Sequence, residues 1–124
     1  MLFAHLNRFY KEKSGKESGV FDKRVSIVRK TIDYLSDNYK NKLSVDDIAF
    51  SMHFSKSYLS HVFKSVTGHS LVDYVNTLRC QNAKALIQSG YSIKQASFEC
   101  GFLDVSYFSR IFKKTMGVLP SSVK

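Results

Sequence analysis

The sequence predicts an all-α fold, and three observations support this prediction. Apolar residues recur at helical spacing along most of the chain, and no segment alternates apolar and polar residues as a half-buried strand does. Ser, Asp and Gly residues stand where these apolar segments begin and end, which is typical of helix caps. Two stretches of the chain also share one pattern, which indicates a small helical unit present in duplicate.

The N-terminal part is predicted to contain a stub, a linker and the first long helix. Residues 1–22 form an N-terminal stub and flexible linker, because a short apolar start is followed by the charged, Gly- and Ser-rich stretch KEKSGKESG. We expect the stub to be the trimmed end of a further domain. The helix then runs from about Lys23 to Tyr39, and apolar residues at helical spacing form its buried face: Val28, Ile32, Leu35 and Tyr39.

Two short helices are expected next. Ser44 with Asp47 forms a capping box at the start of the first, whose buried face is Val45, Ile48, Ala49 and Met52. Ser55 begins the second helix, which ends near Gly68.

The longest helix follows and leads into a second pair of short helices. Ser70 with Asp73 begins the long helix, which runs to Gly90 and is roughly 28 Å long for about 19 residues. Ser92 begins the next helix, Gly101 and Phe102 make a turn, and Asp104 begins a helix that Gly117 ends; Pro120 starts a last short turn.

The stretches Leu43–Tyr74 and Tyr91–Val123 match each other when the second copy is allowed one extra residue. Identical residues fall at equivalent positions, namely Ser44, Phe50, Phe54, Tyr58, Ser60, Phe63, Lys64 and Gly68 in the first copy and Ser92, Phe98, Phe102, Tyr107, Ser109, Phe112, Lys113 and Gly117 in the second. We therefore predict a subdomain at 23–69, a linker helix at 70–90 and a second subdomain at 91–124.

Each copy has the outline of a helix-turn-helix, in which the second helix enters the major groove of DNA. Ala49 and Ser97 are small residues four positions before the turn, where the two helices must approach closely. Gly101 suits the positive φ that such a turn needs, and His53 occupies the same place in the first copy.

The charge of the chain favours a polyanionic partner. The formal charge is +9, from 19 Lys and Arg against 10 Asp and Glu, which suits nucleic acid or an anionic membrane surface. Arg110 is the best single candidate for base reading, because Arg pairs two donors with guanine. Lys64, Lys113 and Lys114, near helix C-termini, are candidates for phosphate contacts, and so is Lys56 at the start of its helix.

Residues 23–124 resemble the DNA-binding domain of the AraC/XylS family of bacterial transcription regulators. The segments that carry the resemblance are LSVDDIA and FSKSYLSHVFKSVTGHS in the first copy, and SIKQAS, GF and SYFSRIFKKTMGVLP in the second. The resemblance implies about seven helices in two helix-turn-helix subdomains joined by a long linker helix. It also implies base-reading roles for Ser57, Ser60, His61, Ser106, Tyr107 and Arg110.

The resemblance further implies a cytoplasmic regulator, usually an activator, that reads two successive major-groove segments of an asymmetric promoter site beside RNA polymerase. Dimerisation through a missing N-terminal domain is compatible with it. Three departures matter. Ala96 and Ser97 stand where the family usually has Ile and Ala, which predicts a looser second core. His61 stands where the family often has Arg, which weakens guanine reading, and Leu103 replaces a polar cap, which leaves Asp104 to begin its helix.

Other functions find less support. The chain lacks the motifs HExxH, GxSxG, GxGxxG and a Walker loop, so we expect neither an enzyme nor a cofactor site. Three spread histidines, at 53, 61 and 69, make a poor zinc site, and Cys80 and Cys100 are expected as buried, reduced thiols. We expect most Phe and Tyr residues in the core. A protein-interaction module or anti-regulator, and a lipid-binding protein, remain alternatives.

Overall fold

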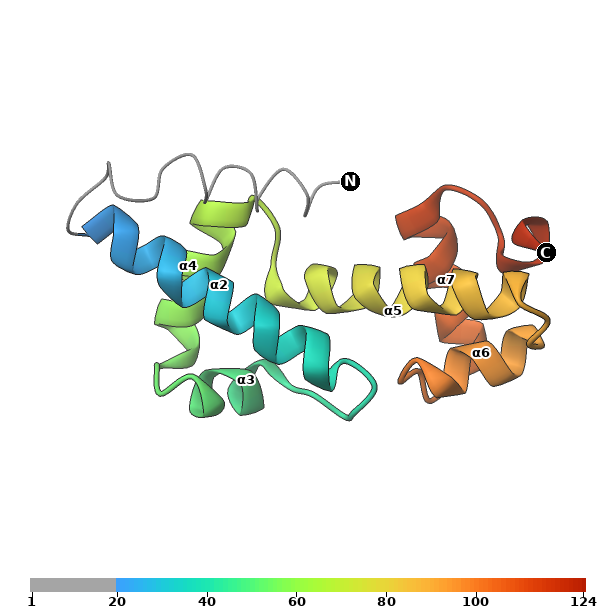
Figure 1. Cartoon of the computed structure of the whole chain (residues 1–124), viewed down its shortest axis with the longest axis horizontal. Coiled ribbons are helices and arrows are strands. Elements are labelled where there is room, and N and C mark those ends of the chain that lie inside the picture. The colour runs from blue at the N-terminus through green and yellow to red at the C-terminus, as the bar shows by residue number, and fades with distance from the viewer. Residues whose placement is uncertain (1–19) are drawn as a thin grey trace. The chain divides into compact units, whose positions relative to one another are not determined.

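The computed structural model describes residues 20–124, which form six α-helices and one short 3₁₀ helix and contain no strand (Figure 1). The predicted all-α fold is confirmed. The elements are α2 Val20–Asn38, α3 Val45–Ser51, α4 Lys56–Thr67, α5 Leu71–Gln88, α6 Ile93–Glu99, α7 Val105–Met116 and η1 Pro120–Val123.

The N-terminal end of the prediction needs one correction. Helix α2 begins at Val20 and not near Lys23, so residues 20–22 belong to a helix and not to the predicted linker. Val20 is the first apolar residue after the Gly- and Ser-rich stretch, and a helix needs no side-chain cap to extend to it. The rest of the predicted stub and linker, residues 1–19, lies outside the described residues.

The described chain divides into two compact units. The first contains residues 20–34 and Val45–Leu71, and the second contains Leu35–Ser44 and Val72–Lys124. All of α5 (Leu71–Gln88) except its first residue therefore belongs to the second unit, and so do the end of α2 and the loop that follows it. The predicted subdomain limits stay a prediction.

In the first unit, α2, α3 and α4 enclose a small apolar core. Val28, Leu59 and Phe63 are almost completely buried, and Ile48 and Ala49 place one face of α3 inside. Side-chain hydrogen bonds also link these helices. The Ser51 hydroxyl donates to the Tyr34 hydroxyl at 3.1 Å, which joins α3 to α2, and the Arg24 guanidinium donates to the Ser65 hydroxyl, which joins α2 to α4.

The second unit has a larger core, in which α5, α6 and α7 meet. The buried residues of this cluster are Cys80, Ala83, Ile87, Ala96, Cys100, Phe102, Phe108 and Phe112. Three aromatic rings pack in sequence, with the Phe108 centroid 5.0 Å from that of Phe102 and 5.4 Å from that of Phe112. This stack fixes the buried face of α7, so the opposite face is presented to solvent.

No described helix has the length and apolar character needed to cross a membrane. Phe63, Phe108 and Phe112 lie in the core as expected, but Phe50, at 83% exposure, and Phe98, at 47%, do not. These two residues occupy equivalent positions on α3 and α6, on the face that neither unit buries.

Candidate nucleic-acid interface

The two short helices α3 and α6 end in the same hydrogen-bonded turn. In the first unit the Phe54 amide donates to the Ala49 carbonyl at 3.0 Å and the His53 amide to the Phe50 carbonyl at 3.1 Å. In the second, Phe102 donates to Ser97 at 3.0 Å and Gly101 to Phe98 at 3.1 Å. This pair of bonds is the Schellman motif, which needs a left-handed residue at the penultimate position.

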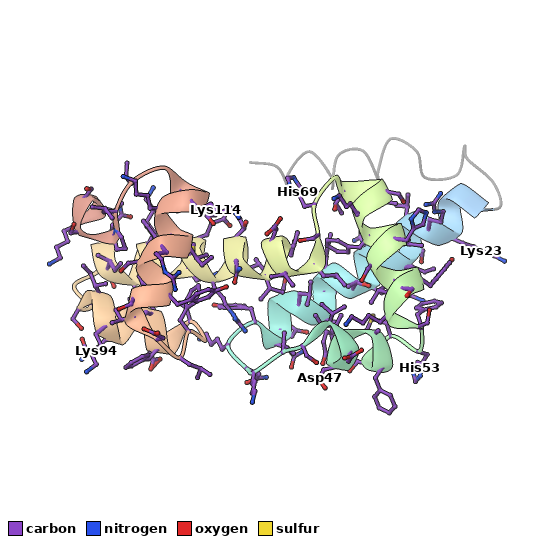
Figure 2. The ribbon with its side chains drawn as sticks, turned by 180° about the vertical axis from the view of Figure 1, so that it is seen from behind. Lys23, Asp47, His53, His69, Lys94 and Lys114 are labelled. Carbon is purple, nitrogen blue, oxygen red and sulfur yellow. The ribbon has the colours of Figure 1, made fainter. Side chains whose placement is uncertain are left out.

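That left-handed residue is the one the sequence predicts in each copy. His53 has a φ of 64° and Gly101 a φ of 100°. His53 is the one non-Gly residue with a positive φ in the described chain, and Figure 2 shows it at the turn between α3 and α4. The small residues expected at the helix crossing, Ala49 and Ser97, are buried. Both helix-turn-helix units are therefore built on one backbone geometry.

The caps of the second helices also follow the prediction. The Ser55 hydroxyl accepts from the Tyr58 amide at 3.2 Å at the start of α4. The Asp104 carboxylate accepts from the Ser106 amide at 2.8 Å at the start of α7. Gly68 and Gly117 end the two helices in the left-handed conformation. A capping box between Ser92 and Gln95 begins α6 in addition.

The predicted contact residues lie on the solvent face of these two helices. Nine of the ten predicted contact residues are exposed, and Ser60 is half-buried. The exposed ones are Ser57, His61, Ser106, Tyr107, Arg110, Lys56, Lys64, Lys113 and Lys114. Lys64 lies in the last turn of α4, and Lys113 and Lys114 lie in the last turn of α7, where Figure 2 labels Lys114. Each helix thus presents exposed polar side chains along its first half and lysines in its last turn.

Arg110 stands at the centre of the exposed face of α7. Its guanidinium carbon lies 5.7 Å from the centroid of the Tyr107 ring, one turn earlier, which orients the side chain along the helix. A hollow of about 360 Å³ follows the same face and is lined by Ser109, Arg110, Lys113, Lys114 and Leu119. Arg110, Lys113 and Lys114 place three cations along this face of α7, which favours a polyanionic partner.

Tyr58 is a residue that the predicted base-reading set leaves out. It is 45% exposed and equivalent in the repeat to Tyr107, which is 41% exposed. Ser60, which the set includes, is half-buried like its counterpart Ser109. The repeat itself indicates Tyr58, because equivalent residues on equivalent helices point the same way.

Both cysteines lie in the core of the second unit. Cys80 and Cys100 are both buried and unpaired, as predicted. Burial raises the pKa of Cys80 to about 12 and that of Cys100 to about 11, so both thiols are neutral at pH 7. Among residues 20–124, no three His, Cys, Asp or Glu side chains are grouped so that they could hold a metal ion.

The sequence is similar to a known protein family and to known transcription regulators. The family model described as "Helix-turn-helix domain" matches residues 48–124. The chain is 33% identical over 94 residues to the uncharacterized HTH-type transcriptional regulator YijO of Escherichia coli K12, a match that covers 74% of this chain and 33% of that protein. It is 30% identical to the transcriptional regulatory protein HptR of Staphylococcus aureus, over 76% of this chain and 37% of HptR. The chain thus spans about a third of the length of these relatives.

Solved structures share the fold. The C-terminal domain of AraT, a response regulator from Geobacillus stearothermophilus, has a TM-score of 0.75 at 29% identity, covering 78% of this chain and 82% of that one. A transcriptional regulator from Chromobacterium violaceum, described as containing an AraC-type DNA-binding domain, has a TM-score of 0.73 at 27% identity, covering 79% and 88%.

Proposed function

The chain belongs to the AraC-type family of helix-turn-helix transcription regulators, and on this basis we propose that it binds double-stranded DNA through α4 and α7. The observation that carries the proposal is the repeated geometry. Two helix-turn-helix units have the same left-handed turn, and each presents an exposed helix face with polar groups and cations and almost no acids. A second helix of this kind is the element that enters the major groove.

The contact residues divide into two classes. In our proposal the residues that face base edges lie in the first two turns of α4 and α7. They are Ser57, His61, Ser106, Tyr107 and Arg110, with the half-buried Ser60 beside them. Lys56, Lys64, Lys113 and Lys114 bind backbone phosphates, because they lie at the helix ends. The phosphate contacts position the protein, and the base contacts give it sequence preference.

The two reading faces differ, and from this difference we infer an asymmetric site. Arg110 in the second copy pairs with guanine, whereas His61 in the first offers a single ring to a base edge. The linker helix α5 contains 18 residues and is about 27 Å long, somewhat less than the 34 Å or so between successive major grooves on one face of DNA. We propose that both grooves are read and that the DNA bends to allow it.

The regulatory outcome in our proposal is activation beside RNA polymerase in the bacterial cytoplasm, as in an AraC-type activator. Free thiols such as Cys80 and Cys100 are typical of cytoplasmic proteins, and bacterial DNA lies in the cytoplasm. In this proposal dimerisation is assigned to residues outside 20–124. A DNA-binding experiment tests DNA recognition alone. It does not distinguish activation from repression, and it does not test contact with RNA polymerase.

The test compares Arg110→Ala with Lys113→Ala, two exposed residues of α7 that differ in proposed role. Fluorescence anisotropy is measured on a selected site, on variants of that site at each base pair and on a mixed-sequence duplex. Arg110→Ala should lose about 1–3 kcal/mol of discrimination at one base pair. Lys113→Ala should weaken binding to every duplex alike and lower the salt slope by about 0.9.

Other results would refute the proposal. Equal affinity of the unaltered chain for all duplexes would indicate non-specific packaging of DNA. Capture by vesicles of phosphatidylglycerol and phosphatidylcholine, without capture of DNA, would indicate a lipid-binding protein. Binding to neither would leave the interaction-module alternative. Thermal unfolding of both variants serves as the control for folding, because both side chains are exposed and their loss should leave the melting temperature almost unchanged.

A further inference from the structure

A basic pocket of about 520 Å³ lies in the second unit, and the two recognition helices alone do not account for it. Its wall includes Lys40 and Lys42 from the loop after α2, Arg79 from α5, Asp104 from the α6–α7 turn, and Tyr107 and Arg110 from α7. We call this the loop pocket. The loop, residues 39–43, precedes the first helix-turn-helix in the chain but belongs to the second unit by its contacts.

Arg79 holds the loop in place. Its Nε donates to the Tyr39 carbonyl at 2.7 Å and its Nη2 to the Asn41 carbonyl at 2.9 Å. The guanidinium carbon also lies 5.8 Å from the centroid of the Phe102 ring, at the turn of the second helix-turn-helix. Charged hydrogen bonds to the carbonyls of residues 39 and 41 fix the backbone on both sides of Lys40.

Gly101 allows this loop to approach the turn. A Cβ at Gly101 would lie 2.7 Å from the Tyr39 carbonyl oxygen and 3.1 Å from that of Lys40. Both atoms belong to the backbone, so the loop and the turn are in direct contact only because residue 101 has no side chain. The positions of Lys40 and Lys42 are therefore set by the same turn that sets the start of α7.

The charges of the loop pocket favour an anion. Four cations line it, and the single carboxylate, that of Asp104, is engaged by the Ser106 amide as the cap of α7. Arg79 is committed to the loop carbonyls, which leaves Lys40, Lys42 and Arg110, all exposed, to meet a ligand. Lysine ammonium groups on flexible stems act as point charges, which suits a phosphodiester without fixed orientation.

We propose that Lys40 and Lys42 bind DNA backbone phosphate beside the groove that Arg110 reads. The loop thereby gives the second unit a phosphate contact from outside its own helix-turn-helix. This inference rests on the proposed function, because it takes α7 as the helix in the groove. DNA is favoured over a free anion because the pocket shares Tyr107 and Arg110 with the exposed face of α7.

The experiment measures the salt dependence of DNA binding by the full chain and by Lys40→Ala/Lys42→Ala. The matched control is Lys30→Ala/Lys84→Ala, which removes the same charge from α2 and α5 at residues that do not line the pocket. Two lost phosphate contacts should lower the salt slope by about 1.8, which is a loss of tens of fold in affinity at about 0.1 M salt. The base preference should not change. The control should change the slope by less than half as much.

A second measurement identifies the ligand. In a duplex carrying methylphosphonate at one backbone position after another, the unaltered chain should lose affinity at a phosphate flanking the α7 half-site, and the double variant should not. The inference fails if the double variant and the control have equal slopes. It also fails if inorganic phosphate shifts the NMR signals of Lys40 and Lys42 while the DNA slope is unaffected. If the unaltered chain does not bind DNA at all, the proposed function itself fails.

Discussion

At the scale of single residues, Gly101 carries the strongest constraint in the second unit. Its φ of 100° is a conformation that L residues rarely adopt, and the space for a Cβ is filled by two carbonyl oxygens. Gly117 has a φ of 83°, but nothing lies within 4 Å of the Cβ position. Substituting the two glycines therefore distinguishes the free-energy cost of a left-handed backbone from the cost of a steric clash at Cβ.

We expect Gly101→Ala to destabilise the chain by several kcal/mol and Gly117→Ala by about 1 kcal/mol, the usual cost of a left-handed alanine. The excess arises because the Tyr39 carbonyl must move, which disturbs its bond from Arg79. Urea unfolding measures both values. Equal losses in the two variants would contradict the close packing of the loop against the turn.

The buried thiols predict how stability depends on pH. The pKa of Cys80 is raised to about 12 and that of Cys100 to about 11 by burial, from an ordinary value of 9.0. The folded state therefore keeps its thiol protons at pH values where the unfolded chain has lost them. This contribution to stability is complete below pH 9 and is lost as the pH rises through about 11 to 12.

The corresponding experiment measures the free energy of unfolding at pH 8 and pH 10.5, for the unaltered chain and for Cys80→Ala/Cys100→Ala. The variant should be less stable at pH 8, because it leaves small cavities, but it should lose less stability on going to pH 10.5. A pH dependence identical to that of the unaltered chain would mean that the thiols are not desolvated in the folded state.

At the scale of elements, the helix ends were the most predictable part of the chain. Ser55 and Asp104 begin α4 and α7, and Gly68 and Gly117 end them, as the sequence predicts. A cap depends on one side chain and its own backbone neighbours, so a single sequence contains the necessary information. The start of α2 was missed because the Ser and Gly residues directly before Val20 belong to the pattern that predicts a linker.

Contacts between distant segments could not be predicted in this way. The loop at 39–43 joins the second unit through Arg79, about forty positions away in the chain, and no local pattern indicates that pairing. Phe50 shows the same limit: its place in the repeat predicts its equivalence to Phe98, but only the packing shows that the face is exposed. For the candidate site, helical periodicity predicted that the contact residues on α4 and α7 would be exposed. It could not predict the loop pocket, which depends on the contact between Arg79 and the loop at 39–43.

The cap of α7 gives a prediction at this scale. Asp104→Ala removes the acceptor for the Ser106 amide and should lower stability by about 1 kcal/mol, whereas Asp104→Asn keeps an acceptor and should lose only part of that amount. Thermal unfolding monitored by circular dichroism compares them. If alanine and asparagine behave alike, the hydrogen bond at the start of α7 does not stabilise the helix.

At the scale of the whole chain, a formal charge of +9 is combined with two helix-turn-helix units of the same backbone design. The turns and caps have the same geometry in both copies, whereas the exposed faces of α4 and α7 differ at His61 and Arg110. Such a chain is expected to bind DNA strongly at low salt and to discriminate through unequal halves.

Selection of bound duplexes from a random DNA pool tests this claim most directly. We predict one asymmetric consensus with two blocks about one helical turn apart, in which Arg110→Ala removes a guanine preference from one block only. A palindromic consensus, a single block or no enrichment at all would contradict recognition by two unequal helix-turn-helix units.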